Sequence, residues 1–359
     1  MKKNLHFVLA LTLGLATTVS AQDWSVDSRT RVNSTEDATS TDQRVRTAVD
    51  FGGDAVSAHV ELNSTATLGK VAGEDFSLTV REAYATTNVM DFASLTAGRM
   101  ALNFGSGRIL GDNNWVNGNG NTWDGFLIGV NNDFADIHVG YAATDLTSLD
   151  TLRYDGITMY FNVGKDMGAM AFNLLYVNTQ NEGAFTAMPD VFEERTSMGL
   201  DASYAMDNGA VLSLGYYTSE TDDVEMDLTT LGVSYAVNSD LTVMAGYDMY
   251  GENGFYMPSG SSFGDGYGSG MNYSAFDATR GECTDLSFGG SYAMGDFMIG
   301  ATMHTISPET EGAFEDISVM DLSVGYTLSD NSSVTLNYAS TDESGDDETQ
   351  TWISLNIGF

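Results

Sequence analysis

The sequence contains little cysteine, little proline and few basic residues. Among 359 residues there are one cysteine, Cys283, and three prolines. A single cysteine cannot form an internal disulfide, which excludes the disulfide-stapled frameworks of small secreted domains. Only 14 lysines and arginines stand against 50 acidic residues, which leaves a formal net charge of −36. Such acidity argues against nucleic acid as a partner, because the chain as a whole repels the phosphate backbone.

Long apolar runs are also missing, except at the beginning. MKKNLHFVLALTLGLATTVSAQD combines a basic start, an apolar stretch (7–16) and the small-residue site VSA (19–21). This pattern predicts a signal peptide at residues 1–21 for Sec-dependent export, with cleavage after Ala21. No run of 18 apolar residues follows, so we expect no helical membrane span in the remaining single domain, 22–359.

Alternation of apolar and polar residues is abundant instead, and a period of two indicates strands with two different faces. The predicted strands are 24–33, 44–51, 55–63, 76–87, 92–103, 122–131, 134–143, 153–164, 167–177, 195–205, 210–218, 227–237, 241–250, 284–293, 296–305, 316–327, 332–340 and 349–359. Each has about the length of 9–11 residues with which a tilted strand crosses a membrane. The hydrophobic fraction of 42% weighs against a disordered acidic chain.

The predicted connections alternate between short and long. Short ones such as GGD (52–54) and NND (131–133) follow every second strand, and loops of about 8 to 30 residues lie between them, the longest at 251–281. Short turns at one rim and long loops at the other are typical of an outer-membrane barrel. We therefore predict an all-β, antiparallel, up-and-down transmembrane barrel of about 18 strands (16 as the alternative count), with short periplasmic turns and long extracellular loops.

The C-terminus fits this prediction. Four strands end in a tyrosine before a short turn, in SYAMDNG, SYAVNSD, SYAMGDF and GYTLSDN, as an aromatic belt at a membrane interface would. The last strand carries its apolar residues at Ile353, Leu355, Ile357 and Phe359. This alternating aromatic ending resembles the signal by which outer-membrane proteins of Gram-negative bacteria reach their insertion machinery. Lipid and lipopolysaccharide are then the surroundings of the barrel.

No catalytic motif is present. HExxH, GxSxG, GxxxxGK and paired-cysteine patterns are absent from the sequence, so no enzyme is predicted. The stretch DNN (112–114) with NGNGN (117–121) lacks the spacing of an EF-hand. No metal site and no cofactor are predicted, apart from divalent cations that acidic extracellular loops would bind.

The basic residues are concentrated in the first third of the chain. Strand parity turns Arg29, Arg31, Arg44 and Arg46 toward the lumen, and Arg81 as well if a bulge accommodates Glu82. Parity places five carboxylates of later strands on the same inner side: Asp136, Asp201, Asp248, Asp285 and Asp321. The arginines either form a basic arc that orients an anionic solute or neutralise neighbouring carboxylates.

One stretch carries a family resemblance. AGRMALNFGSGRILGDNNWVNGNGNTWDGFLIG (97–129) resembles the signature of the alginate export family of outer-membrane barrels. The matching positions are Gly98, Arg99, Gly105, Arg108, Gly111, Trp115, Trp123, Asp124 and Gly125. The resemblance implies a monomeric channel with an arginine-rich lumen that passes an anionic polysaccharide. Arg99 and Arg108 are expected to meet near the mouth of the barrel and line a constriction.

Three functional hypotheses follow. The first is a channel of the alginate export type for anionic saccharides or other small anions, lined by the seven arginines Arg29, Arg31, Arg44, Arg46, Arg81, Arg99 and Arg108. The alternative is a general diffusion porin for small hydrophilic solutes. The third is a surface adhesin barrel that conducts nothing.

Overall fold

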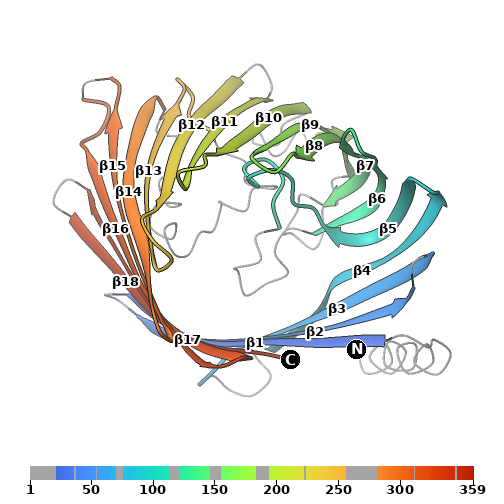
Figure 1. Ribbon diagram of the computed structural model, residues 1–359, viewed down its shortest axis with the longest axis horizontal. Coiled ribbons are helices and arrows are strands. Elements are labelled where there is room, and N and C mark those ends of the chain that lie inside the picture. The colour runs from blue at the N-terminus through green and yellow to red at the C-terminus, as the bar shows by residue number, and fades with distance from the viewer. Residues whose placement is uncertain are drawn as a thin grey trace.

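Eighteen antiparallel strands form one closed sheet around a hollow interior (Figure 1). The computed structural model describes residues 22–35, 38–53, 55–69, 76–112, 122–145, 155–182, 194–221, 224–255, 281–310, 312–343 and 346–359. The predicted signal peptide lies outside these residues. Among the residues described, no helix has the length and apolarity that a membrane crossing requires.

The described residues contain every predicted strand, 18 in all, so the predicted fold is confirmed. The strands are β1 (Gln22–Thr35), β2 (Thr39–Gly52), β3 (Val56–Thr67), β4 (Phe76–Met90), β5 (Ala93–Ala101), β6 (Thr122–Asn131), β7 (Asp136–Asp145), β8 (Asp155–Asp166), β9 (Met170–Glu182), β10 (Glu194–Ala205), β11 (Ala210–Thr221), β12 (Val224–Ala236), β13 (Leu241–Tyr250), β14 (Cys283–Met294), β15 (Phe297–Pro308), β16 (Ile317–Ser329), β17 (Ser332–Glu343) and β18 (Asp346–Gly358).

The barrel closes because β1 pairs with both β2 and β18. In the β1–β18 ladder Val32 lies opposite Ile353. The final residue continues that ladder, since Phe359 N donates to Val26 O at 2.9 Å and Val26 N donates to Phe359 O at 3.2 Å. Closure satisfies the backbone groups of both edge strands, which lipid has no means to do.

Several strands extend further than the sequence pattern indicates. β1 ends at Thr35 and β2 begins at Thr39, while β11 and β12 are separated only by residues 222–223. The long loops predicted at these two places are therefore wrong. The strand ends there are rich in Thr, Ser, Asp and Glu, because pairing continues beyond the apolar band, where both faces of a strand meet water.

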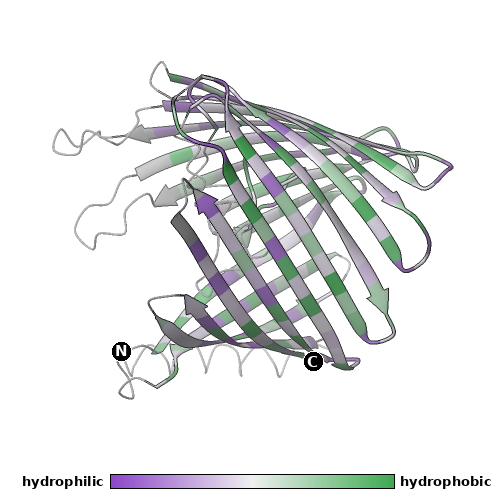
Figure 2. Cartoon of the chain, turned by 90° about the vertical axis from the view of Figure 1, so that its left-hand side faces the viewer, coloured by the Kyte–Doolittle hydropathy of each residue, from purple (hydrophilic) through white to green (hydrophobic). Residues whose placement is uncertain are grey.

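The two faces of the wall differ, as the alternating bands in Figure 2 show. On β18 Trp352 is 1% exposed and faces inward, whereas Ile353 is 49% exposed and faces outward. Tyr204, Tyr235 and Tyr292, each just before a short turn, also lie exposed on the outside. This is the arrangement that a hydrocarbon environment with an interfacial belt requires.

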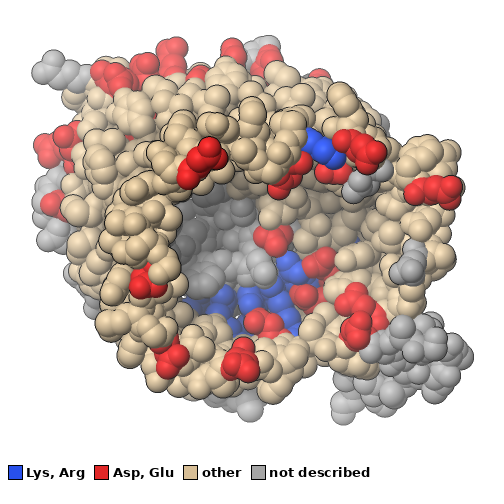
Figure 3. Space-filling model, viewed as in Figure 1, with Lys and Arg blue, Asp and Glu red and all other residues tan. Residues whose placement is uncertain are grey.

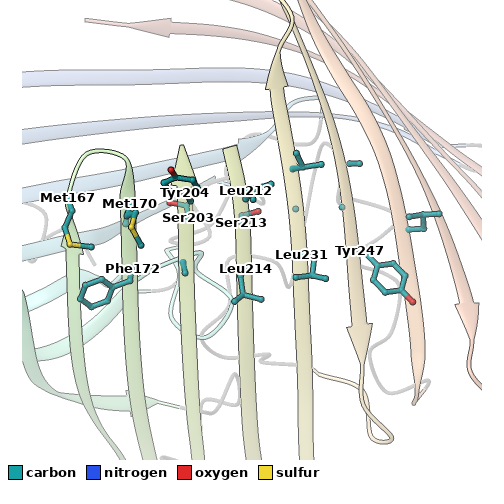
Figure 4. A pocket seen from close by; sticks show the side chains of 17 residues that line it. Met167, Met170, Phe172, Ser203, Tyr204, Leu212, Ser213, Leu214, Leu231 and Tyr247 are labelled. Carbon is teal, nitrogen blue, oxygen red and sulfur yellow. The ribbon is translucent and has the colours of Figure 1, made fainter. Parts of the chain in front are cut away.

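The outer surface of β9–β14 carries a group of apolar side chains (Figure 4). Phe172, Leu214 and Leu231 project there around a shallow groove, whose floor is kept low by small residues such as Ala202 and Ala245. Lipid chains fill such grooves in a membrane, so this surface belongs to the outer wall and not to the channel.

Candidate functional site: the lumen

Five arginines gather on one side of the lumen. Arg29 and Arg31 lie on β1, Arg44 and Arg46 on β2, and Arg81 on β4, with residue exposures of only 2–6%. We call this set the basic arc. Figure 3 shows Lys and Arg side chains together inside the hollow of the barrel, beside acidic ones.

The strand register stacks these side chains in rows. Arg29 lies directly opposite Arg44, and Arg46 lies opposite Asp27 on β1. The Nη2 of Arg44 donates to Asp27 Oδ1 at 2.6 Å, and Arg46 Nε lies 3.6 Å from Glu61 Oε1. Carboxylates thus accompany the arc, which reduces the cost of burying several cations on neighbouring strands.

A β-bulge places Arg81 within the arc. Glu61 pairs with Glu82 and the next residue, Leu62, pairs with Val80, so Arg81 is the extra residue on β4. The bulge expected from the sequence near this position is therefore present. Arg81 Nη1 donates to Glu61 Oε1 at 3.1 Å and also contacts the carboxylate of Glu82.

Residues 102–112, which follow β5, fold into the barrel (Figure 1). The Ser106 backbone N donates to Asp201 Oδ2 at 3.2 Å, and Ser106 Oγ lies 2.8 Å from the hydroxyl of Tyr217. Arg108 Nη2 donates to Asp248 Oδ2 at 2.9 Å. The loop is therefore attached to β10, β11 and β13, on the side of the lumen that faces the arc.

Apolar contacts hold the same loop against the wall. Ile109 and Leu110 are each 2% exposed and belong to one internal cluster with Leu175 of β9 and Tyr217 of β11. Gly199 on β10 makes room, because a Cβ there would lie 2.9 Å from Ile109 Cδ1. The sequence placed arginines and carboxylates on the inner face, but this part of the lumen is filled by hydrophobic packing.

The carboxylates opposite the arc have partners of their own. Asp201 accepts from Ser106 and from the Tyr217 hydroxyl, and Asp248 accepts from Arg108. Asp285 Oδ2 lies 3.0 Å from His304 Nδ1, on the neighbouring strand. Three of the five predicted inward carboxylates thus hold the loop or the wall in place.

Arg99 does not lie where the sequence led us to expect it. Arg99 on β5 and Asp124 on β6 are cross-strand neighbours that form a two-pronged ion pair of 2.8 and 2.6 Å. Trp123, the next residue of β6, is 6% exposed inside the barrel, whereas Phe126, on the face of Asp124, is 49% exposed outside. Arg99 therefore faces outward and does not meet Arg108.

The physical reason is the internal apolar cluster. Met100 and Leu102 lie on the opposite face of the strand from Arg99, so a lumen-facing Arg99 would turn both toward lipid. Both residues instead face inward, 4% and 3% exposed, and pack in the cluster beneath the loop. β5 then needs no bulge, and Arg99 shares the outer face with Leu95 and Ala97.

The glycines of the 97–129 motif serve local geometry. Gly98 has φ +131°, and a Cβ there would lie 2.2 Å from Ala83 O. Gly125, its cross-strand partner, would place a Cβ 1.9 Å from Tyr141 O. Gly105 turns inside the loop at φ +58°, and Gly111 is buried at its end. Trp115 lies outside the described residues.

Two inner-wall residues escaped the sequence reading. Tyr217 was taken as part of an ordinary strand, yet its hydroxyl contacts Ser106 and its ring packs in the cluster with Ile109 and Leu110 of the loop. His59 belongs to no sequence motif, but it lies next to the arc, with Nδ1 2.8 Å from Asp50 Oδ1. Inner-face parity was the available signal for both.

Comparisons with known proteins agree with this geometry. A family model described as Gram-negative porin matches residues 248–359. OpdK of Pseudomonas aeruginosa, solved with vanillate, is similar with a TM-score of 0.72 at 14% identity, over 95% of this chain and 99% of that chain. OccK3 (OpdO) of Pseudomonas aeruginosa is similar with a TM-score of 0.73 at 14% identity, over 97% of this chain and 98% of that chain. OccD3 (OpdP) of Pseudomonas aeruginosa is similar with a TM-score of 0.70 at 13% identity, over 95% of this chain and 92% of that chain. No curated protein matches the chain in sequence.

These findings overturn the resemblance to the alginate export family. The family model that matches describes porins, and the similar structures are Pseudomonas channels of the Occ type. The motif that suggested alginate export builds the entry of the inward loop and an ion pair on the outer wall. The predictions of an outer-membrane location and of a non-enzymatic role are confirmed, and the chain has the fold of an outer-membrane porin.

Proposed function

We propose that this porin admits small organic anions and that the basic arc selects them. The observation that carries the proposal is the placement of five arginines on one side of the lumen, facing carboxylates that are engaged by Ser106, Arg108 and His304. An anion passing the arc meets several guanidinium groups in succession. Guanidinium matches carboxylate geometry with two parallel hydrogen bonds.

The position of loop 102–112 inside the lumen favours a small solute over a large one. Its apolar side chains occupy the lumen beside β8–β11, so a solute passes between the loop and the arc. An aromatic carboxylate fits such a path, because its ring suits the apolar side and its carboxylate the arginines. OpdK, which has this fold, was solved with vanillate.

A general diffusion porin is the second candidate. The ion pairs of Arg44 with Asp27 and of Arg81 with Glu61 lower the net charge of the arc. If these pairs cancel the field, the arc only limits the size of the solute.

Reversal potentials in a salt gradient test the proposal. We expect wild-type channels to prefer anions, most strongly at low ionic strength, where the Debye length is longest. The double variant Arg29→Gln/Arg44→Gln, which removes one row of the arc, should lose that preference. Arg99→Gln is the control, because it removes one positive charge from the outer face. Equal potentials in wild type and double variant would contradict the proposal.

Solute entry into liposomes separates the two candidates. Vanillate should enter faster than vanillyl alcohol, an uncharged molecule of similar shape, and this difference should vanish in the double variant. Equal rates of the two solutes through the wild-type channel would establish the diffusion porin. Heat-modified gel mobility checks that each variant forms a folded barrel.

A further inference from the structure

Three potential metal ligands meet on the inner wall of β3 and β4, at the end of the arc nearest the short turns. One ligand atom each from His59, Glu61 and Glu82 can be chosen so that all lie within 4.8 Å of one another. His59 and Glu61 are two residues apart on β3 and share a face, and Glu61 lies directly opposite Glu82. Glu82 comes from the neighbouring strand, so the three ligands do not form a contiguous sequence motif.

The imidazole of His59 is already oriented. Its Nδ1 lies 2.8 Å from Asp50 Oδ1, and its ring stacks on Tyr84 with centroids 5.0 Å apart. When the Nδ1–H group of His59 donates to Asp50, Nε2 is left as the ligand atom. Metal-binding histidines usually donate their other ring N–H to a carboxylate in this way, which fixes the tautomer and raises the basicity of the ligand.

The two glutamates need a cation between them. Like charges directly opposite one another on neighbouring strands are destabilising. In the structure Arg81 Nη1 supplies the positive charge by bonding both carboxylates. Arg81 has a second acidic neighbour, because its Nη2 lies 3.9 Å from Asp112 Oδ2. The arginine can therefore turn toward the loop when another cation takes its place.

We infer that His59, Glu61 and Glu82 form a binding site for a borderline divalent transition metal, with Zn²⁺ as the representative ion. One imidazole with two carboxylates suits Zn²⁺, Mn²⁺ or Fe²⁺ better than Mg²⁺ or Ca²⁺, which prefer ligand sets of oxygen alone. Side chains that are 13–16% exposed leave the remaining coordination positions open to the lumen. The bound ion adds two positive charges to the arc, so Zn²⁺ should increase anion preference.

Calorimetric titration of the full-length, EDTA-treated barrel with Zn²⁺ tests the site. We expect saturable binding of one ion. His59→Gln removes a ligand and should weaken binding at least tenfold, and Asp50→Asn, which removes only the orienting carboxylate, should weaken it about tenfold. His138→Gln is the control, because His138 also faces the lumen but its Nδ1 lies 3.4 Å from Asn162 Oδ1, away from the proposed site. Equal binding in His59→Gln and wild type would overturn the inference.

Arg81→Gln distinguishes a metal site from glutamates that serve only as ion-pair partners of Arg81. If the glutamates form a cation site, removing the competing guanidinium should tighten Zn²⁺ binding, by about tenfold for one charge at this distance. If they only hold Arg81, the variant should lose barrel stability and gain no affinity for Zn²⁺. Calorimetry does not depend on conduction, so this result stands whether or not the channel selects anions.

Discussion

Arg108 and Asp248, 140 residues apart in the chain, form an ion pair of 2.9 Å that joins loop 102–112 to β13. Their side chains are 17% and 14% exposed, so the pair is largely sequestered from solvent. It draws the loop onto the acidic side of the lumen. The basic arc lies on the opposite side, on β1, β2 and β4.

Loss of this pair should loosen the loop. A hydrogen bond between charged groups contributes about 1.5–3 kcal/mol, so we expect Arg108→Gln to lower the free energy of unfolding by about that amount. Single-channel recordings should show larger current fluctuations, because the loop samples more positions. Arg195→Gln is the control, since Arg195 bonds Thr221 within the wall. Quiet channels with wild-type conductance would show that other contacts hold the loop.

Gly98 should not tolerate a side chain. Its φ of +131° and the 2.2 Å separation of a built Cβ from Ala83 O both oppose alanine. Backbone strain of this kind costs about 1–3 kcal/mol, so the folded fraction of Gly98→Ala on a heat-modified gel should fall. Gly53→Ala, where a Cβ meets open space, should fold like wild type. Normal folding of Gly98→Ala would mean that the β4–β5 ladder shifts at little cost.

The Arg99–Asp124 pair should stabilise the wall without affecting conduction. Both side chains are partly exposed, 38% and 53%, and exposed pairs contribute about 0.2–1 kcal/mol. Arg99→Gln should lower the resistance to heat by a small amount, and the exchange Arg99→Asp/Asp124→Arg should restore it. The reversal potential should stay at the wild-type value in both. A shifted potential would place this pair in the ion path.

Deletion of Phe359 should reduce insertion and leave conduction unchanged. The residue contributes two backbone hydrogen bonds to Val26 and an outward aromatic side chain that is 75% exposed. Phe359→Ala keeps the backbone pairing and removes only the ring. If both variants insert poorly, the aromatic ring is the assembly signal. If only the deletion inserts poorly, the backbone pairing of Phe359 with Val26 is what insertion requires. Normal insertion of both would refute the prediction for the C-terminus.

The sequence by itself determined the strands and their inner and outer faces. The hydrocarbon of the membrane requires apolar side chains on one face of each strand and closed hydrogen bonding along the edges. Apolar and polar residues therefore alternate along each strand with a period of two. Parity placed Arg29 and Arg44 on the inner face, where the structure has them. Their role in selecting anions stays a prediction.

Tertiary structure decided what lies inside the barrel. Parity assumes that apolar residues face lipid, and this failed on β5, where Met100 faces an internal cluster and Arg99 faces outward. The cluster exists because loop 102–112 returns into the lumen, and its partner Asp248 is far away in the chain. The meeting of His59 with Glu82 depends likewise on the register of β3 and β4 and on the bulge at Arg81. Contacts between strands and loops distant in sequence leave no local pattern, because each side chain satisfies its own strand's alternation whatever it later meets.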